Sequence, residues 1–280
     1  MDFYFGRLNI AGGYEGDKAE RLLAALRAGI IINKYNNNWT VYDVSMWSRG
    51  DSDAQSFIVG RLTRYHDTKE DTFDDETKRP TQMSVPRKVY GEGRFFIHVK
   101  SMLIAYSPDS GIRESSFRRY LAEIIHHGLG GILVHVEIDP IIEAYQFIRD
   151  VKSLDTVRDI SVWIKPSNPG YKDQWKEVDE ELQEEKVEEF HTRYKLKDKV
   201  KAAIPEGGFL EKILLMVSDG YGNAKARGTK DGEMKTIRSG QAPKQVEFDS
   251  KEVDDAQVAE RLADDLEAMS SQQIPYDGNS

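Results

Sequence analysis

The alternation of hydrophobic and polar positions predicts strands and helices along most of the chain. The run FYFGRLNI (3–10) predicts a first strand, and the segment 16–30 places apolar residues at helical spacing behind Asp17, which suits a helix N-cap. Two β-rich runs at 39–47 and 55–66, joined by a turn-rich segment, predict a hairpin. The N-terminal part is therefore expected to form a strand, a helix and a hairpin.

The middle of the chain shows the most regular alternation. In order, it predicts a bent strand or tight hairpin at 94–107, a helix at 114–128, a strand at 131–139, a helix opened by Pro140 at 140–154, a strand at 157–166 and a long charged helix at 173–196. Residues 212–232 then return to strands, and residues 254–269 form a closing helix. This order predicts an α+β protein with mainly antiparallel or mixed sheets, helices packed on one face and a ferredoxin-like middle portion.

The length of 280 residues fits one large domain or two small ones. We expect a β-rich N-terminal lobe at 1–82, an α+β lobe at 83–250, and an acidic helix with a disordered tail at 251–280. A single domain stays open as an alternative, because strands from both halves can join one sheet.

The closing helix carries an apolar stripe formed by Val258, Leu262, Leu266 and Met269. A lone helix of this length is marginal in water, so the stripe needs a surface to cover it. Two interpretations stay open. The helix docks on its own chain, or residues 251–270 serve self-association or a protein partner.

The glycine-rich stretch SDGYGNAKARGTKDGEMKT (218–236) also has two interpretations. A phosphate cradle requires a strand, a glycine loop and a helix in that order, and no helical period follows these glycines. The Asp231-Gly232 pair between two β-capable runs instead predicts a hairpin that turns at 230–232. We therefore expect no phosphate site there, and no cofactor is predicted for the chain.

Composition narrows the class of protein. No apolar run reaches the length of a membrane span, so no membrane insertion is expected. Cysteine is absent, which excludes thiolate ligands and nucleophiles and fits a reducing cytoplasm. The acidic segment 66–80 is expected to be a mobile loop, and it lacks the ligand pattern of a calcium site, so no metal is predicted.

The formal net charge of −9 argues against a protein that coats nucleic acid through bulk charge. The charge is unevenly distributed, however, because residues 87–120 contain seven basic and three acidic side chains. A local nucleic-acid surface in this region stays open beside ordinary mixed surface charge.

Two predicted strands carry histidines with charged neighbours on one face. His98 and Lys100 share a face of the first strand, and His135 and Glu137 share a face of the second. If these strands are neighbours, the four side chains converge and can perform metal-independent acid–base chemistry on a phosphodiester. The alternatives are a metal held by two histidines and a carboxylate, or the solvated face of a half-covered sheet.

Four segments of the second half of the chain carry a family resemblance. They read SSFRRYLAEII, LVHVEI, SLDTVRDISVWIKPSNPGYKDQW and VSDGYGNAKARGTKDGEMKTIRSGQAPKQVEF. Their order resembles the uncharacterised bacterial family DUF4747, which is encountered in mobile-element and phage-defence neighbourhoods. The chain departs from the family pattern at PSNP (166–169) and at 221–224. The resemblance implies no catalytic residues that can be transferred.

These observations predict a cytoplasmic component of a bacterial anti-phage defence or mobile-element system that recognises a protein or nucleic-acid trigger. The defence role is implied by the resemblance alone. An effector nuclease that uses the faces of His98 and His135 is one alternative, and a structural subunit is another.

Overall fold

The structure is a computed structural model that describes residues 2–12, 17–48, 56–66, 69–74, 78–84, 88–131, 134–143, 145–167, 170–196, 203–241, 243–248, 255–271 and 274–275. Every strand pair within these residues is antiparallel. The predicted α+β class with antiparallel sheets is confirmed.

Eight strands form the larger sheet, in the order β15-β1-β8-β7-β4-β3-β2, with β9 also paired to β1. Their bounds are β1 Asp2–Ala11, β2 Ile32–Lys34, β3 Asn37–Ser48, β4 Ser56–His66, β7 Lys88–His98, β8 Leu103–Pro108, β9 His135–Pro140 and β15 Gln245–Glu247. We call this sheet, together with helices α1 (Lys18–Arg27), α2 (Glu114–Gly128) and α6 (Asp255–Ser271), the eight-stranded unit. Strands from both sides of residue 82 join it, because β4 pairs with β7.

A ferredoxin-like arrangement lies within this unit. The strands β9-β1-β8-β7 lie side by side, and α1 follows β1 while α2 connects β8 to β9. This is the β-α-β-β-α-β order of ferredoxin-like folds, with the strands β2 to β6 inserted between α1 and β7. The ferredoxin-like part therefore combines residues 88–140 of the middle portion with the N-terminal β1 and α1.

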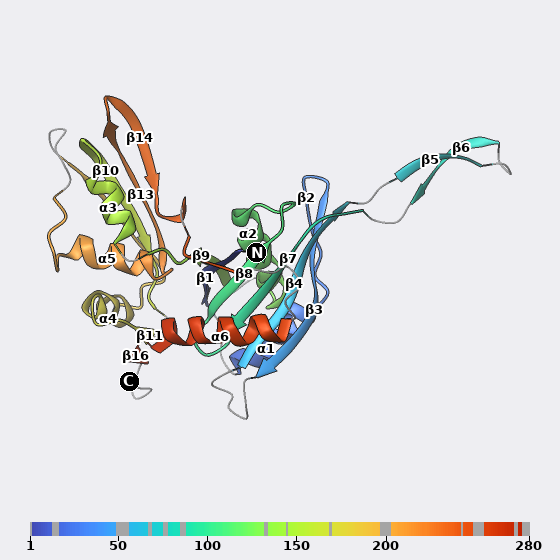
Figure 1. Cartoon of the computed structure of the whole chain (residues 1–280), viewed down its shortest axis with the longest axis horizontal. Coiled ribbons are helices and arrows are strands. Elements are labelled where there is room, and N and C mark those ends of the chain that lie inside the picture. Colours follow the sequence, from blue (N-terminus) through green and yellow to red (C-terminus); the bar gives the residue numbers. More distant parts are fainter. Residues whose placement is uncertain are drawn as a thin grey trace.

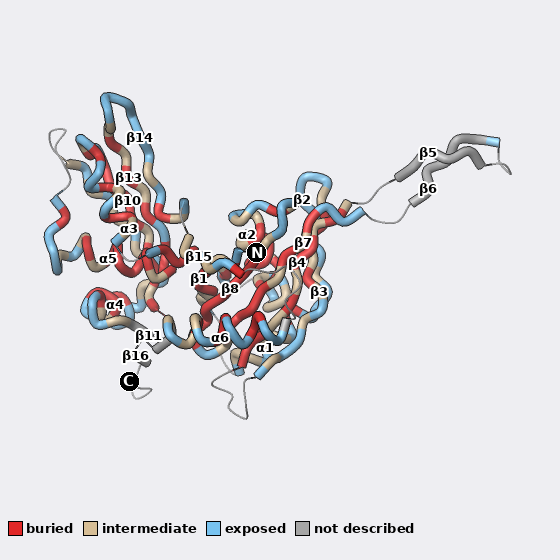
Figure 2. Tube along the Cα trace, in the orientation of Figure 1, coloured by how far each residue is buried: buried red, intermediate tan, exposed pale blue. Residues whose placement is uncertain are grey.

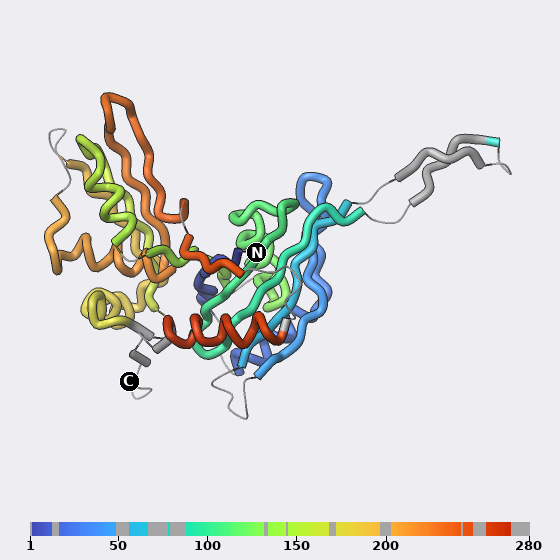
Figure 3. The backbone as a smooth tube through the Cα atoms, viewed as in Figure 1, coloured from blue at the N-terminus to red at the C-terminus, as the bar shows by residue number. Residues whose placement is uncertain are grey.

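Helices cover both faces of the larger sheet. Leu22 of α1 and Phe117 of α2 belong to one buried cluster, and Val258, Leu262 and Leu266 of α6 belong to another. Figure 1 shows α6 lying across the strands, and Figure 3 shows the chain returning to this sheet at its C-terminal end. The apolar stripe of the closing helix thus docks on its own chain, the first of the two interpretations.

The second sheet has the order β12-β10-β13-β14. Its strands are β10 Thr156–Ile164, β12 Phe190–Lys195, β13 Gly222–Lys230 and β14 Glu233–Arg238. One face is covered by helices α3 (Gln146–Lys152), α4 (Lys176–Glu184) and α5 (Phe209–Ser218), which share a buried cluster with β10 and β13. We call residues 145–241 the four-stranded unit. Figure 2 shows its interior buried and much of β14 exposed.

The predicted hairpin at the glycine-rich stretch is confirmed. Strands β13 and β14 pair from Lys225–Arg238 to Lys230–Glu233. The turn residues Asp231 and Gly232 have φ values of 53° and 79°. Two successive positive φ values are the geometry that an Asp-Gly hairpin turn requires.

Two predicted helices of the middle region are present but shorter than predicted. Pro140 is the last residue of β9 and does not open a helix. The amides of Ile141 and Ile142 donate to the carbonyls of Phe5 and Ser218, and α3 starts only at Gln146. The long charged helix stops at Glu184, and its last turn lacks the basic residues that favour a helix C-terminus. Residues 190–195 instead alternate as β12 against β10.

The run KILLMVS (212–218) belongs to helix α5, whereas its sequence predicts a strand. A short, almost wholly apolar run carries no periodicity, and it is buried along the helix.

Short strand pairs replace two further expectations of loop or disorder. The backbone of the acidic segment forms β5 (Lys69–Asp74) paired with β6 (Arg79–Ser84) in place of the predicted loop. Near the C-terminus, β16 (Ile274–Pro275) pairs with β11 (Gly170–Tyr171). The predicted tail positions 272–273 and 276–280 lie outside the described residues, and η2 (Ser239–Gln241) is a short 3-10 turn after β14.

Candidate functional site

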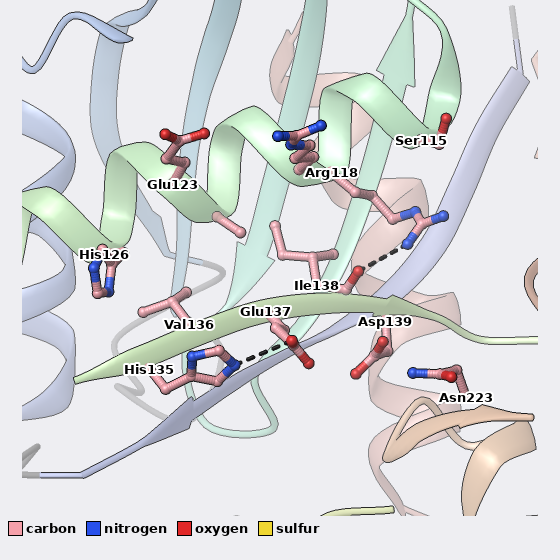
Figure 4. Close-up of a pocket in the computed structure, with 12 residues that line it drawn as sticks. Ser115, Arg118, Glu123, His126, His135, Val136, Glu137, Ile138, Asp139 and Asn223 are labelled. Atoms are coloured by element: carbon pink, nitrogen blue, oxygen red, sulfur yellow. Dashed lines mark hydrogen bonds and ion pairs between the residues drawn. The ribbon is translucent and has the colours of Figure 1, made fainter. Parts of the chain in front are cut away.

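Three polar side chains project from β9 toward the four-stranded unit. Val136 and Ile138 pack in the core with α1 and α2, so the alternation of a strand places His135, Glu137 and Asp139 on the opposite face. Figure 4 shows these three side chains along the same side of β9. This face is where the two units meet.

Glu137 is the centre of a charged group. His135 Nε2 lies 3.0 Å from one of its carboxylate oxygens, and Lys165 Nζ forms an ion pair with the other. Burial alone would raise the pKa of Glu137, but the hydrogen bonds and charges of Lys165 and His135 hold that pKa below its ordinary value. Glu137 is therefore ionised at neutral pH, and it links a strand of one unit to the end of a strand in the other.

Asp139 is the buried member of the group, at 8% exposure. Burial is the main cause that raises its pKa from 3.8 to about 6, and the negative charge of Glu137 adds to the effect. A hydrogen bond from Asn9 Nδ2, 2.9 Å long, and the charges of Lys165 and Arg118 offset only part of it. Buried carboxyls with raised pKa values are common at functional sites.

Side chains of β1 bind the four-stranded unit directly. Arg7 is 2% exposed, and it donates to the carbonyls of Asp219 (2.8 Å) and Ser101 (3.0 Å). Its guanidinium also lies 4.2 Å from the ring centroid of Tyr221. Beside it, Asn9 donates to the carbonyl of Gly220 at 2.8 Å.

Gly220 permits this close approach. It has a φ of +82°, and a Cβ there would come within 2.8 Å of the Cβ of Arg7. Any side chain at position 220 would therefore strain the backbone and push the two units apart.

Three cavities that share lining residues surround the group of His135, Glu137 and Lys165. The largest, about 460 Å³, lies between α2 and β9 and reaches Asn223 of β13 (Figure 4). A second of about 260 Å³ is lined by His135 and Lys165 among others. The third, about 160 Å³, is lined by Glu137, Trp163, Lys165, Glu189, Gly222 and Asn223. We call the region where the two units meet the junction. It is hollow, and Glu137 and Lys165 lie on its walls.

The face of the second sheet opposite α3, α4 and α5 is strongly basic. Ala224, Ala226 and Ile237 pack toward the helices, so their strand neighbours point the other way. The cross-strand register gathers five cationic side chains on this face, which we call the basic face: Arg193, Lys195, Lys225, Arg227 and Arg238.

One buried carboxylate lies beneath the basic face. Asp159 is 1% exposed; it accepts a hydrogen bond from Arg227 Nε at 3.3 Å and lies 3.4 Å from a guanidinium nitrogen of Arg193. That second contact is an ion pair only, because the Oδ2 atom of Asp159 accepts no hydrogen bond from the described residues. The two arginine side chains stay about 40% exposed, so Asp159 holds the guanidiniums in place while part of each faces solvent.

The other three cations of the basic face have no carboxylate partner within the described residues. Lys225 lies directly across from Arg238 in the β13–β14 pair. Like charges placed directly opposite on a sheet destabilise it. The arrangement costs stability in the absence of a ligand, and an anion bound over the face would remove that cost.

An aromatic pair closes the end of the basic face that adjoins the junction. Trp163 of β10 stacks on His191 of β12, with ring centroids 4.5 Å apart and an interplanar angle of 7°. Trp163 and Asn223 are cross-strand partners and both line the 160 Å³ cavity. The basic face and the junction are thus one continuous surface.

Comparison with known proteins gives a family for this chain. A family model described as Domain of unknown function (DUF4747) matches residues 1–264. The chain belongs to the DUF4747 family. No curated protein matches it. The family resemblance predicted from the motifs is confirmed, and the matched segment of this DUF4747 chain spans both units.

The predicted convergence of two histidine strands does not occur. Strands β1 and β8 lie between β7 and β9, so His98 and His135 are three strands apart. His98 is 2% exposed, and its Nδ1 lies 2.6 Å from the hydroxyl of Ser101, beneath the α6 face. Lys100 lies exposed in the β7–β8 turn. Only His135 and Glu137, two of the four predicted residues, come together.

Part of the basic segment predicted at 87–120 reaches the site. Arg118 and Arg119 line the 460 Å³ cavity from α2. Arg118 is held by Glu114 at 2.6 Å, and it donates to the carbonyl of Ile138 at 2.9 Å (Figure 4).

The residues of the basic face are absent from the sequence-based predictions. The signal is present, because AKAR (224–227) and TRYK (192–195) each place two basic side chains at alternate positions. Assigning HTRYK to a helix hides it, since the same residues do not share a face of a helix.

Two further features are absent from the described residues. In this part of the chain, no group of three or more His, Cys, Asp or Glu side chains could hold a metal ion. Over the same residues, no helix is long and apolar enough to cross a membrane.

Proposed function

We propose that this protein recognises nucleic acid through the basic face and the junction beside it. In the wider role that we propose, this recognition is the trigger-sensing step of a bacterial anti-phage defence or mobile-element system in the cytoplasm. The defence role rests on the neighbourhoods in which the DUF4747 family is encountered.

The juxtaposition of Lys225 and Arg238 carries the proposal. A chain with a net charge of −9 concentrates five cations on one sheet face over a single buried carboxylate. Two cations placed directly opposite each other destabilise the sheet, so ordinary surface charge gives no reason for this pair. Binding of phosphates gives one, because each phosphate that the cations neutralise releases counterions and adds affinity. An acidic protein is the rival trigger, and the aromatic pair at the end of the basic face favours nucleic acid over it.

Charge reversal tests the proposal. Lys225 and Arg238 are suitable because neither holds Asp159, whereas changing Arg227 would leave that buried carboxylate without its hydrogen bond. We expect Lys225→Glu/Arg238→Glu to weaken binding of a fluorescent 20-nucleotide probe by at least about ten-fold, and to reduce the slope of log K against log salt by about one per lost phosphate contact.

Lys235→Glu is the matched control for the double variant. Lys235 is exposed on the same strand β14 but lies across from Gly228, on the helix-covered side. Lys235→Glu changes the net charge by half as much as the double variant. If its loss of binding free energy is half as large, the effect is one of overall charge. Failure of the native protein to bind any nucleic acid at low salt would overturn the proposal and leave the protein trigger.

A nuclease remains the second candidate because His135 is 60% exposed and paired with Glu137 beside the basic face. A carboxylate that orients a histidine raises its capacity as a general base. Cleavage of labelled RNA or DNA by the purified protein, abolished in His135→Ala, would support this candidate. Identical cleavage by the variant would exclude His135 as the catalytic base.

A further inference from the structure

We infer that the nucleic acid is single-stranded and that one of its bases leaves the stack to enter the 160 Å³ cavity beside Trp163. This inference rests on the proposed function, since it specifies the ligand of the same surface. The inference specifies that the nucleic acid is single-stranded, that a pocket holds one base, and that Trp163 stacks on that base.

The cavity has walls suited to a flat ring. Trp163 of β10 and Gly222 of β13 both line it. A Cβ at position 222 would lie 2.0 Å from the carbonyl oxygen of Trp163, so only glycine fits there, with a φ of +145°. The wall beside the indole therefore has no side chain at this point.

The stack on His191 fixes the orientation of the indole. Parallel rings 4.5 Å apart restrict the rotation of Trp163 about its side-chain bonds. An aromatic side chain held in this way is a stacking platform that accepts any base, because every base has a π-face.

The charges around the cavity separate base from backbone. Two carboxylates, Glu137 and Glu189, line the cavity with Lys165 and Asn223. Carboxylates repel phosphate but accept hydrogen bonds from the amino groups of bases. The polar lining therefore suits the edge of a base, and the phosphates would bind the cations of the basic face outside the cavity.

The nearest cations of the basic face lie two residues along each strand from the residues beside the cavity. Lys225 and Arg193 lie two residues from Asn223 and His191, which corresponds to roughly 7 Å along a strand. A single strand can pass over these cations while it turns a base toward Trp163. The bases of a duplex are paired and stacked, and extruding one of them costs a few kcal/mol.

Fluorescence anisotropy with labelled 12-nucleotide single strands of DNA and of RNA, and with the matching DNA duplex, tests the inference. We expect the native protein to bind a single strand more tightly than the duplex. Trp163→Leu should weaken single-strand binding by on the order of ten-fold and leave duplex binding unchanged, whereas Trp163→Phe should retain most of the affinity. The DNA and RNA arms identify which sugar the site prefers.

Two controls make the result decisive. Trp47→Leu removes an indole from β3, in the other unit, where Trp47 packs on Phe57. Trp47→Leu should leave binding unchanged. Melting temperatures of Trp47→Leu and Trp163→Leu close to that of the native protein would show that both variants fold. Should Trp163→Leu melt early, quenching of native tryptophan fluorescence by the single strand, absent in Trp163→Phe, provides the second readout.

The outcomes separate this inference from the proposed function. If Lys225→Glu/Arg238→Glu loses binding while Trp163→Leu keeps it, the basic face binds nucleic acid and the base pocket is wrong. Duplex binding as tight as single-strand binding overturns the inference in the same way. If neither variant changes affinity, both proposals fail.

Discussion

At the scale of single residues, the junction contains an ionisable carboxyl, that of Asp139, at a position where burial disfavours its charged form. Asp139 is nearly enclosed, yet it lies beside Glu137, whose negative charge raises its pKa further. Asn9 needs only one acceptor there, and a neutral amide oxygen would serve. The carboxyl at position 139 is therefore not required for the contact with Asn9, and its cost to stability can be measured.

The first prediction concerns the pH dependence of that cost. The pKa of Asp139 is about 6 in the folded protein and 3.8 for an ordinary aspartate, so the folded state holds the proton more tightly. The free energy of unfolding therefore falls as pH rises between these values and stays lower above them, by on the order of 3 kcal/mol. Asp139→Asn should raise the melting temperature at pH 8 and change it little near pH 4.

Asp173→Asn, at an exposed aspartate, is the control and should leave both melting temperatures unchanged. A lower melting temperature of Asp139→Asn at pH 8 would contradict the prediction. It would mean that the attraction of Lys165 and Arg118 for the carboxylate outweighs its burial.

The second prediction isolates backbone strain at Gly232. This residue has a φ of +79°, and a Cβ added there would meet no atom within 4 Å, so a substitution meets no steric obstacle. Gly232→Val should destabilise the protein by about 1–2 kcal/mol in urea unfolding, because β-branched residues tolerate positive φ poorly. Gly232→Asn should cost less. Equal stability of the valine and native proteins would mean that the turn relaxes to another geometry.

At the scale of elements, local signals decide what the sequence can predict. The Asp231-Gly232 turn and the cap at Asp17, which accepts from the amides of Ala19 and Glu20, depend on neighbours in sequence, and both are confirmed. Helix α5 escapes prediction because its apolar run has no period. The distance between His98 and His135 depends on the order of strands in the sheet, which alternation along one strand does not specify.

The third prediction concerns helix α6, whose apolar stripe is buried on the larger sheet. Leu262 is fully buried against residues of that sheet. Leu262→Ala should destabilise the protein by about 2–5 kcal/mol through lost burial and a cavity, as buried leucines do. Glu260→Ala, at an exposed position of the same helix, should stay within about 0.5 kcal/mol.

Light scattering on Leu262→Ala separates docking from association. Because the stripe is covered by its own chain, the oligomeric state should not change. Loss of a dimer with an unchanged melting temperature would instead mean that α6 stabilises contacts between chains.

At the scale of the whole molecule, the proposed ligand surface requires the two units to keep a fixed relation. The base pocket takes Glu137 from the eight-stranded unit and Trp163 and Asn223 from the four-stranded unit. A hinge at the junction would open that pocket and separate the cavities from the basic face. The buried contacts of Arg7 are the strongest candidates for preventing this motion, since they end on both units.

The last prediction tests whether Arg7 couples the units. Arg7→Ala removes donors to the carbonyls of Asp219 and Ser101 and the contact with Tyr221, which should cost on the order of 3 kcal/mol. Calorimetry should show one transition for the native protein and two for the variant, with weaker single-strand binding.

Arg64→Ala is the matched control: Arg64 donates to Asn37 and Gly111 and lies over Trp39, all within the eight-stranded unit. It should lower stability without splitting the transition, because its contacts do not cross the junction. Two transitions in the native protein would mean that the units already unfold independently, and that the ligand, not Arg7, must bring the pocket together.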